Sequence, residues 1–116
     1  MRIGELSRRS GVSVRALRYY EQQGLLAPQR RPSGYRVYGA DDVATVGRIR
    51  TLLAAGLSTA QILEVLPCVV EIEDLLAPGC EGLVTGMIEQ RDRIDGAIHE
   101  LQTTRARLDD IIARAM

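Results

Sequence analysis

The sequence of 116 residues has room for one small domain and an extended element, and it lacks Phe and Trp, so any core must be aliphatic. It contains no apolar run of about 18 residues and no N-terminal signal pattern, which argues against a membrane span and leads us to expect a cytoplasmic protein. The net charge of zero conceals two opposite halves: residues 1–50 carry ten Arg and four acidic residues, whereas residues 51–116 carry five Arg and eleven acidic residues. This asymmetry predicts that the first half binds a polyanion, the competing interpretation being two faces that neutralise one another.

Two short helices joined by a tight turn are predicted at the start of the chain. Apolar residues with helical spacing mark both of them: Ile3 and Leu6 in the first helix, and Val14, Leu17 and Tyr20 in the second. Gly11 ends the first helix, Ser13 can cap the second, and Gly24 fits the left-handed residue that ends it. Two helices of this length around a Ser-Gly-Val turn are typical of a helix-turn-helix.

Residues 30–38 change to the pattern of a small β-ribbon. Pro32-Ser33-Gly34 is a turn sequence, and the run from Tyr35 to Tyr38 follows it as a short strand. We therefore expect a two-stranded hairpin that projects as a wing.

Two further helices and a loop are predicted after the wing. Asp41 or Asp42 caps the first of these helices, which repeats Val43, Val46, Ile49 and Leu53 and stops at Gly56. A capping box at residues 58–61 begins the next helix, which runs through Leu66 and is halted by Pro67. Residues 67–79 are expected to be a loop with at most one helical turn.

A single long helix is predicted from about Glu81 to Arg114, with a heptad pattern of apolar residues. Taking Val84 as position a, the a and d positions are mostly apolar and define these dimerisation residues: Val84, Met87, Arg91, Ile94, Ile98, Leu101, Arg105, Leu108 and Ile112. The pattern indicates a coiled coil, and the placement of Arg91 and Arg105 symmetrically about Ile98 favours an antiparallel pair. The competing interpretation is one amphipathic helix packed on its own head.

Several stretches resemble the MerR family of bacterial transcriptional regulators. They are Ile3-Gly4-Glu5-Leu6, the run from Gly11 to Glu21 with its Arg-Tyr-Tyr-Glu end, Gly24-Leu25-Leu26, and Ser33-Gly34-Tyr35-Arg36-Val37-Tyr38. The resemblance covers residues 1–66 closely and implies a winged helix-turn-helix, an antiparallel coiled-coil dimer and promoter distortion. It also implies a short form without a C-terminal effector domain, and RNA polymerase as a partner at the promoter.

The candidate DNA contacts lie on the second helix and on the wing. A recognition helix enters the major groove by its N-terminal part, and Arg can form forked hydrogen bonds to guanine or phosphate. Tyr20 is expected in the core, and a solvated edge is the competing interpretation for the wing. The predicted contacts are Ser13, Val14, Arg15, Arg18, Tyr19, Arg30, Arg31, Tyr35 and Arg36.

The two cysteines leave alternatives open. Cys80 directly precedes the long helix, whose N-terminal amides favour a thiolate. Cys68 and Cys80 could form a reversible disulfide, bind a soft metal or electrophile, or simply pack as small buried residues. In metal-sensing members of the family a cysteine near this helix joins ligands from a loop beyond its far end. No second cysteine pair follows here, so we predict no metal site of that design and no cofactor.

The sequence therefore predicts a mainly α protein: a winged helix-turn-helix head with a small β-hairpin wing over 1–66, a hinge loop over 67–80, and a coiled-coil dimerisation helix over 81–116. We expect a homodimeric, sequence-specific regulator that binds a palindromic operator and distorts promoter DNA. The alternatives are a DNA-architectural or excisionase-like protein without signal reception, and a thiol- or soft-metal-responsive sensor. No nucleophile, phosphate loop or carboxylate cluster indicates an enzyme.

Overall fold

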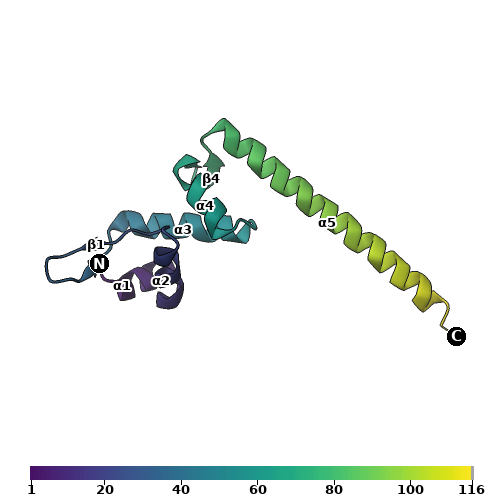
Figure 1. Ribbon diagram of the computed structural model, residues 1–116, viewed down its shortest axis with the longest axis horizontal. Helices are drawn as coiled ribbons and strands as arrows, with labels where there is room; N and C mark the ends of the chain where they lie inside the picture. Colours follow the sequence, from purple (N-terminus) through teal and green to yellow (C-terminus); the bar gives the residue numbers. More distant parts are fainter. Residues whose placement is uncertain (116) are drawn as a thin grey trace. The chain divides into compact units, whose positions relative to one another are not determined.

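The computed structural model describes residues 1–115 and divides into two compact units, Met1–Ala77 and a second that begins at Pro78 (Figure 1). The first unit contains α1 (Ile3–Ser10), α2 (Val14–Gln22), β1 (Gln29–Arg30), β2 (Arg36–Val37), α3 (Ala40–Ala54), α4 (Thr59–Val65), the 3-10 turn η1 (Leu66–Cys68) and β3 (Val69–Ile72). β4 (Leu75–Pro78) reaches the boundary, and the second unit is dominated by α5 (Glu81–Ala113). None of the described helices is both long and apolar enough to cross a membrane.

The first unit is held by a largely aliphatic core, in a chain that lacks Phe and Trp. Helix α1 packs against α2 and α3, and α3 packs against α4. The five side chains that are completely buried are Leu6, Leu17, Val46, Ile49 and Ile62. Each such side chain stabilises the fold by about 1.5–3 kcal/mol relative to leaving it in water. Tyr20 is buried with them, as predicted.

Three serines fix the turn between α1 and α2. Gly11 adopts φ 74°, the left-handed conformation that ends α1. The Ser7 hydroxyl donates to the carbonyl of Val12 (2.6 Å), and the Val12 amide donates to Ser10 Oγ (3.2 Å). Ser13 Oγ accepts from the amide of Ala16 (3.1 Å), so Ser13 caps α2 as predicted. The turn thereby holds α2 at a defined angle to α1.

The start of α3 differs from the prediction. Gly39 is the N-cap, and Asp42 lies three residues later, where its Oδ2 accepts from the Gly39 amide (2.8 Å). The prediction that an Asp caps this helix is therefore wrong; the carboxylate stabilises the helix start from inside the first turn. The buried face also differs, because α3 buries Leu52 and leaves Leu53 half-buried.

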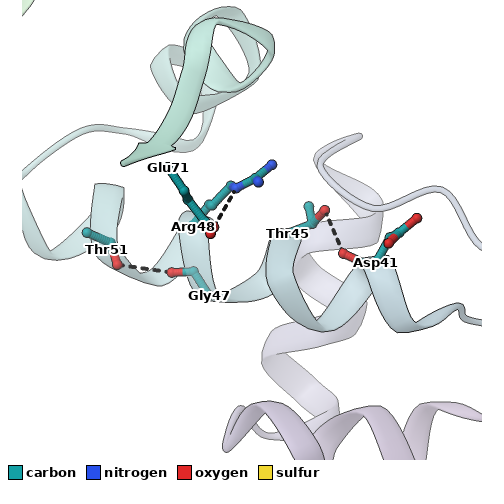
Figure 2. Close-up of polar contacts among 6 residues, drawn as sticks. All are labelled: Asp41, Thr45, Gly47, Arg48, Thr51 and Glu71. Atoms are coloured by element: carbon teal, nitrogen blue, oxygen red, sulfur yellow. Dashed lines mark hydrogen bonds and ion pairs between the residues drawn. The ribbon is translucent and has the colours of Figure 1, made fainter. Parts of the chain in front are cut away.

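Residues 67–79 are not the loop that the sequence predicted. They contain the end of η1 and the hydrogen-bonded pair β3 and β4, joined by Glu73 (φ 52°) and Asp74 (φ 62°). A two-residue turn with both residues at positive φ is the type that matches strand twist, but it normally carries Gly or Asn. The sequence therefore lacked the usual turn signal. Arg48 Nε lies 3.1 Å from Glu71 Oε1 and ties α3 to β3 (Figure 2).

The side chains beside Arg48 stay within α3. Figure 2 shows the Thr45 hydroxyl donating to the carbonyl of Asp41 and the Thr51 hydroxyl donating to the carbonyl of Gly47, each over 3.1 Å. These bonds satisfy the two hydroxyls locally.

Helix α5 is continuous over 33 residues, which confirms the predicted long helix nearly to the residue. Apolar side chains at its predicted a and d positions are exposed in the single chain, among them Ile94 (43%), Ile98 (47%) and Leu101 (71%). An exposed apolar stripe of this kind is typical of an interaction surface.

The burial of α3 can be tested with two neighbouring leucines. Leu52→Ala should lower the free energy of unfolding by about 2–5 kcal/mol, because it leaves a cavity in the core. Leu53→Ala removes the same atoms from a half-buried position and should cost clearly less. Urea denaturation of both variants measures the difference; an equal or larger loss for Leu53→Ala would contradict the observed face.

Candidate nucleic-acid interface

Helix α2 separates an apolar face from a basic one. Leu17 and Tyr20 are buried against the core, whereas Arg15, Arg18 and Tyr19 are exposed. The helix begins at Val14, directly after its Ser13 cap, so the predicted contact residues lie in its first two turns. The exposed face has the charge and hydrogen-bond donors that a recognition helix needs.

The wing is a short antiparallel ribbon whose register is Gln29 opposite Val37 and Arg30 opposite Arg36. Its loop is closed by the Arg31 amide, which donates to the carbonyl of Tyr35 (2.9 Å), and by the Gly34 amide, which donates to the carbonyl of Arg31 (2.8 Å). Gly34 adopts φ 88°, as a three-residue hairpin loop ending in a left-handed residue requires. The predicted wing contacts Arg30, Arg31, Tyr35 and Arg36 are all exposed.

Glu21 joins the recognition helix to the wing. Its Oε1 lies 3.3 Å from Arg36 Nε, and its Oε2 accepts from Arg36 Nη1 and from the Tyr38 hydroxyl, each over 3.3 Å. Since the Glu21 side chain is only 17% exposed, this ion pair is more sheltered from solvent than an ordinary surface pair. Arg36 is therefore partly engaged within the head, which the sequence did not indicate.

Tyr38 anchors the second strand of the wing. It is 3% exposed, and its amide donates to the carbonyl of Met1 (2.6 Å). Burial of the phenol raises the pKa of Tyr38 above its usual 10.0, and the negative charge of Glu21 and its hydrogen bond raise it further. The phenol therefore remains a neutral donor to Glu21 at physiological pH.

A groove of about 380 Å³ lies between the wing, α2 and the N-terminal residues Arg2 and Ile3. Its lining includes four arginines and no acidic residue: Arg2, Ile3, Arg18, Arg30, Gly34, Tyr35, Arg36 and Tyr38. The guanidinium carbon of Arg2 lies 4.2 Å from the centroid of the Tyr35 ring, a cation–π contact that steadies the exposed phenol. The sequence assigned no role to Arg2 or to Glu21, although Glu21 ends the Arg-Tyr-Tyr-Glu motif, because both act through residues distant in sequence.

The structure brings together four of the predicted contacts, Arg18, Arg30, Tyr35 and Arg36, around this groove. The other predicted DNA contacts also belong to the head, and the predicted dimerisation residues lie along α5. Cys68 ends η1 and Cys80 is the N-cap of α5, and neither is a free thiol. Within residues 1–115, no three His, Cys, Asp or Glu side chains gather in a way that could hold a metal ion.

The head has the architecture of a winged helix-turn-helix: α1 and α2 with their turn, followed by a β-ribbon. A family model described as MerR HTH family regulatory protein matches residues 1–67. The chain is 49% identical over 67 residues to heavy metal-dependent transcription regulator 2 of Rhizobium meliloti, covering 57% of this chain and 46% of that relative. It is 31% identical over 112 residues to the HTH-type transcriptional regulator HmrR of Rhizobium leguminosarum bv. viciae, covering 97% and 84%. The chain therefore belongs to the MerR family, as predicted.

Solved structures show the same fold over nearly the whole chain. PbrR691 from Ralstonia metallidurans CH34, a transcription regulator solved in complex with lead(II), superposes with a TM-score of 0.79 at 24% identity, covering 100% of this chain and 88% of that one. HiNmlR, a MerR family regulator that lacks the sensor domain and is bound to promoter DNA, gives 0.58 at 22% identity, covering 97% and 86%. The chain spans about half the length of the Rhizobium meliloti relative.

The raised pKa of Tyr38 makes stability depend on pH. The pKa of Tyr38 in the folded state lies above 10.0. The contribution of its neutral phenol to the free energy of unfolding is therefore complete below about pH 10, and it is lost as pH rises through the folded-state pKa. The unfolding free energy of the wild type should therefore fall more steeply above pH 10 than that of Tyr38→Phe. Glu21→Gln, which removes the charge, should give an intermediate slope. Identical slopes for the wild type and Tyr38→Phe would contradict the assignment.

Proposed function

We propose that the chain is a sequence-specific transcriptional regulator that binds a palindromic promoter operator as a homodimer. The observation that carries this proposal is the groove between α2 and the wing, where four arginines gather without an acidic residue. The head as a whole also has an excess of positive charge, since residues 1–50 contain ten Arg and four acidic residues. Relatives named as transcription regulators and a DNA-bound neighbour of the same fold support the proposal.

The two basic elements would take different parts in binding. The start of α2, with Ser13, Val14 and Arg15, would enter the major groove, and Arg15 and Arg18 would donate to guanine edges or phosphates. Tyr19 would reach a phosphate beside the helix. The wing, held to α2 by Glu21, would contact the flanking sugar–phosphate backbone, which positions the head without reading sequence.

The homodimer would be formed by α5. Its exposed apolar stripe has the heptad spacing of a coiled coil, and a helix of 33 residues offers more than four heptads of contact. Two heads on one dimer would meet the two halves of a palindrome, as two-fold symmetric proteins do. Sedimentation of the wild-type chain checks this directly.

Distortion of the operator would be the regulatory act. Two heads fixed to a stiff coiled coil cannot adjust their spacing freely, so the DNA would bend and untwist to meet both. That deformation costs about 1–6 kcal/mol and depends on the spacer sequence. It would realign promoter elements for RNA polymerase and allow one dimer to repress or to activate. A signal would act at the segment 67–80 by changing the population of two head arrangements.

DNA affinity should depend on both basic elements. Arg18→Ala and Arg36→Ala should each weaken binding to the operator by about tenfold in a mobility-shift assay, since each removes a donor beside DNA. Arg36→Ala also leaves Glu21 without its ion pair and brings an uncompensated carboxylate near the phosphates. Arg107→Ala, on the heptad c position of α5, removes the same charge from a residue outside the head and serves as the control. Wild-type affinity in both head variants would refute the proposed interface.

The central base pairs of the operator should be distorted without touching protein. Chemical probes of unstacked or bent DNA should react more strongly there in the complex than in free DNA, because the deformation is concentrated between the two half-sites. Transcription that responds to the protein while footprinting shows an undistorted centre would rule out this mechanism and leave simple binding as the regulatory act.

A further inference from the structure

The apolar stripe of α5 is interrupted twice by arginine. Arg91 and Arg105 occupy a positions between apolar layers, and both are exposed in the single chain. The only ion pair described for either is that of Arg91 with the adjacent Asp92, at 3.8 Å, between side chains that are 68% and 65% exposed. Such a pair is worth little. The stripe therefore places two cations in the seam of the proposed homodimer, and their placement constrains how the helices can pair.

A parallel pairing in register is unfavourable for this sequence. It would set Arg91 against Arg91 of the partner subunit and Arg105 against Arg105 of the partner subunit, creating two layers of like charge in the seam. An antiparallel pairing sets each a position opposite a d position instead, so the arginines face apolar residues and never one another.

The antiparallel direction is the one expected of this family; we infer that, within it, the two-fold axis of the α5 pair lies between Ile98 and Leu101. Ile98 then lies opposite Leu101 of the partner subunit, and Arg91 lies opposite Leu108 of the partner subunit. Arg105 lies opposite Ile94 of the partner subunit. This register rests on the proposed homodimer and specifies it further.

The register is selected by two aspartates. Asp95 and Asp109 occupy e positions, directly after the d residues Ile94 and Leu108. In an antiparallel coiled coil the e edges of the two helices face each other, and position a is the seam position next to that edge. Arg91 therefore meets Asp109 of the partner subunit, and Arg105 meets Asp95 of the partner subunit, which gives four interhelical ion pairs in the dimer.

Other registers lose these pairs. A shift of one heptad in one direction places Arg91 beside Gln102 of the partner subunit and Arg105 beside Ile88 of the partner subunit. The opposite shift places Arg105 beside Gln102 of the partner subunit. Both shifts also leave part of the apolar stripe without a partner. Charge pairs at the edges of a coiled coil mainly choose partner and register, which is the role the geometry assigns to these four residues.

Complementary charge reversal tests the register in the full chain. Arg91→Asp with Arg105→Asp places like charges at all four contacts of the homodimer, and so does Asp95→Arg with Asp109→Arg. Each double variant alone should dissociate with a Kd about tenfold or more above that of the wild type in sedimentation. An equimolar mixture restores all four contacts, two with reversed and two with native polarity, so it should form a heterodimer with a Kd near the wild-type value.

The control is Glu100→Arg with Asp110→Arg, which makes the same change in charge as Asp95→Arg with Asp109→Arg but at outward c and f positions, and it should dimerise as the wild type does. Recovery in the mixture also shows that the variants fold. Suppose that the wild type is a dimer that binds the operator. If both double variants then dimerise with the wild-type Kd, or if their mixture forms no heterodimer, the register is overturned while the proposed function stands. A wild-type monomer at micromolar concentration would overturn the homodimer and the register together.

Discussion

The sheltered carboxylate of Glu21 connects the two halves of the basic surface. It lies on α2, accepts from Arg36 on the wing and from Tyr38 behind it, and so holds the ribbon against the recognition helix. A two-stranded ribbon is only marginally stable in isolation. The groove between helix and wing, and with it the arrangement of Arg18 and Arg30, depends on this tie.

The distribution of charge follows from that arrangement. The sheltered side chain of Glu21 orients Arg36 within the head, whereas the lining of the groove contains no acidic residue. The acidic residues are instead concentrated after residue 51, outside the part of the sequence that forms the groove. A polyanion would therefore be attracted to the head and repelled by most of the remaining chain, which orients the encounter before any specific contact forms.

The small core is consistent with the proposed pairing of α5 with a second copy. The head buries mainly aliphatic side chains together with Tyr20 and Tyr38, and α5 leaves its stripe exposed in the single chain. Pairing two long helices would bury that stripe and add apolar contact that a chain of this size cannot supply alone. The same seam would set the distance between the heads, so in this family member the element that stabilises the protein would also determine how DNA is distorted.

The sequence by itself determined the helices, the wing and the family. Helical spacing, the Ser13 and Ser58 caps and the turn before Tyr35 depend on neighbours in the chain, so they could be read locally. Tertiary structure decided what no local pattern encodes. It placed Arg2 on Tyr35 and Glu21 between Arg36 and Tyr38, and it selected Leu52 over Leu53 for the core. It also formed the β3–β4 pair around two non-glycine residues at positive φ, because strand pairing can override local turn preference.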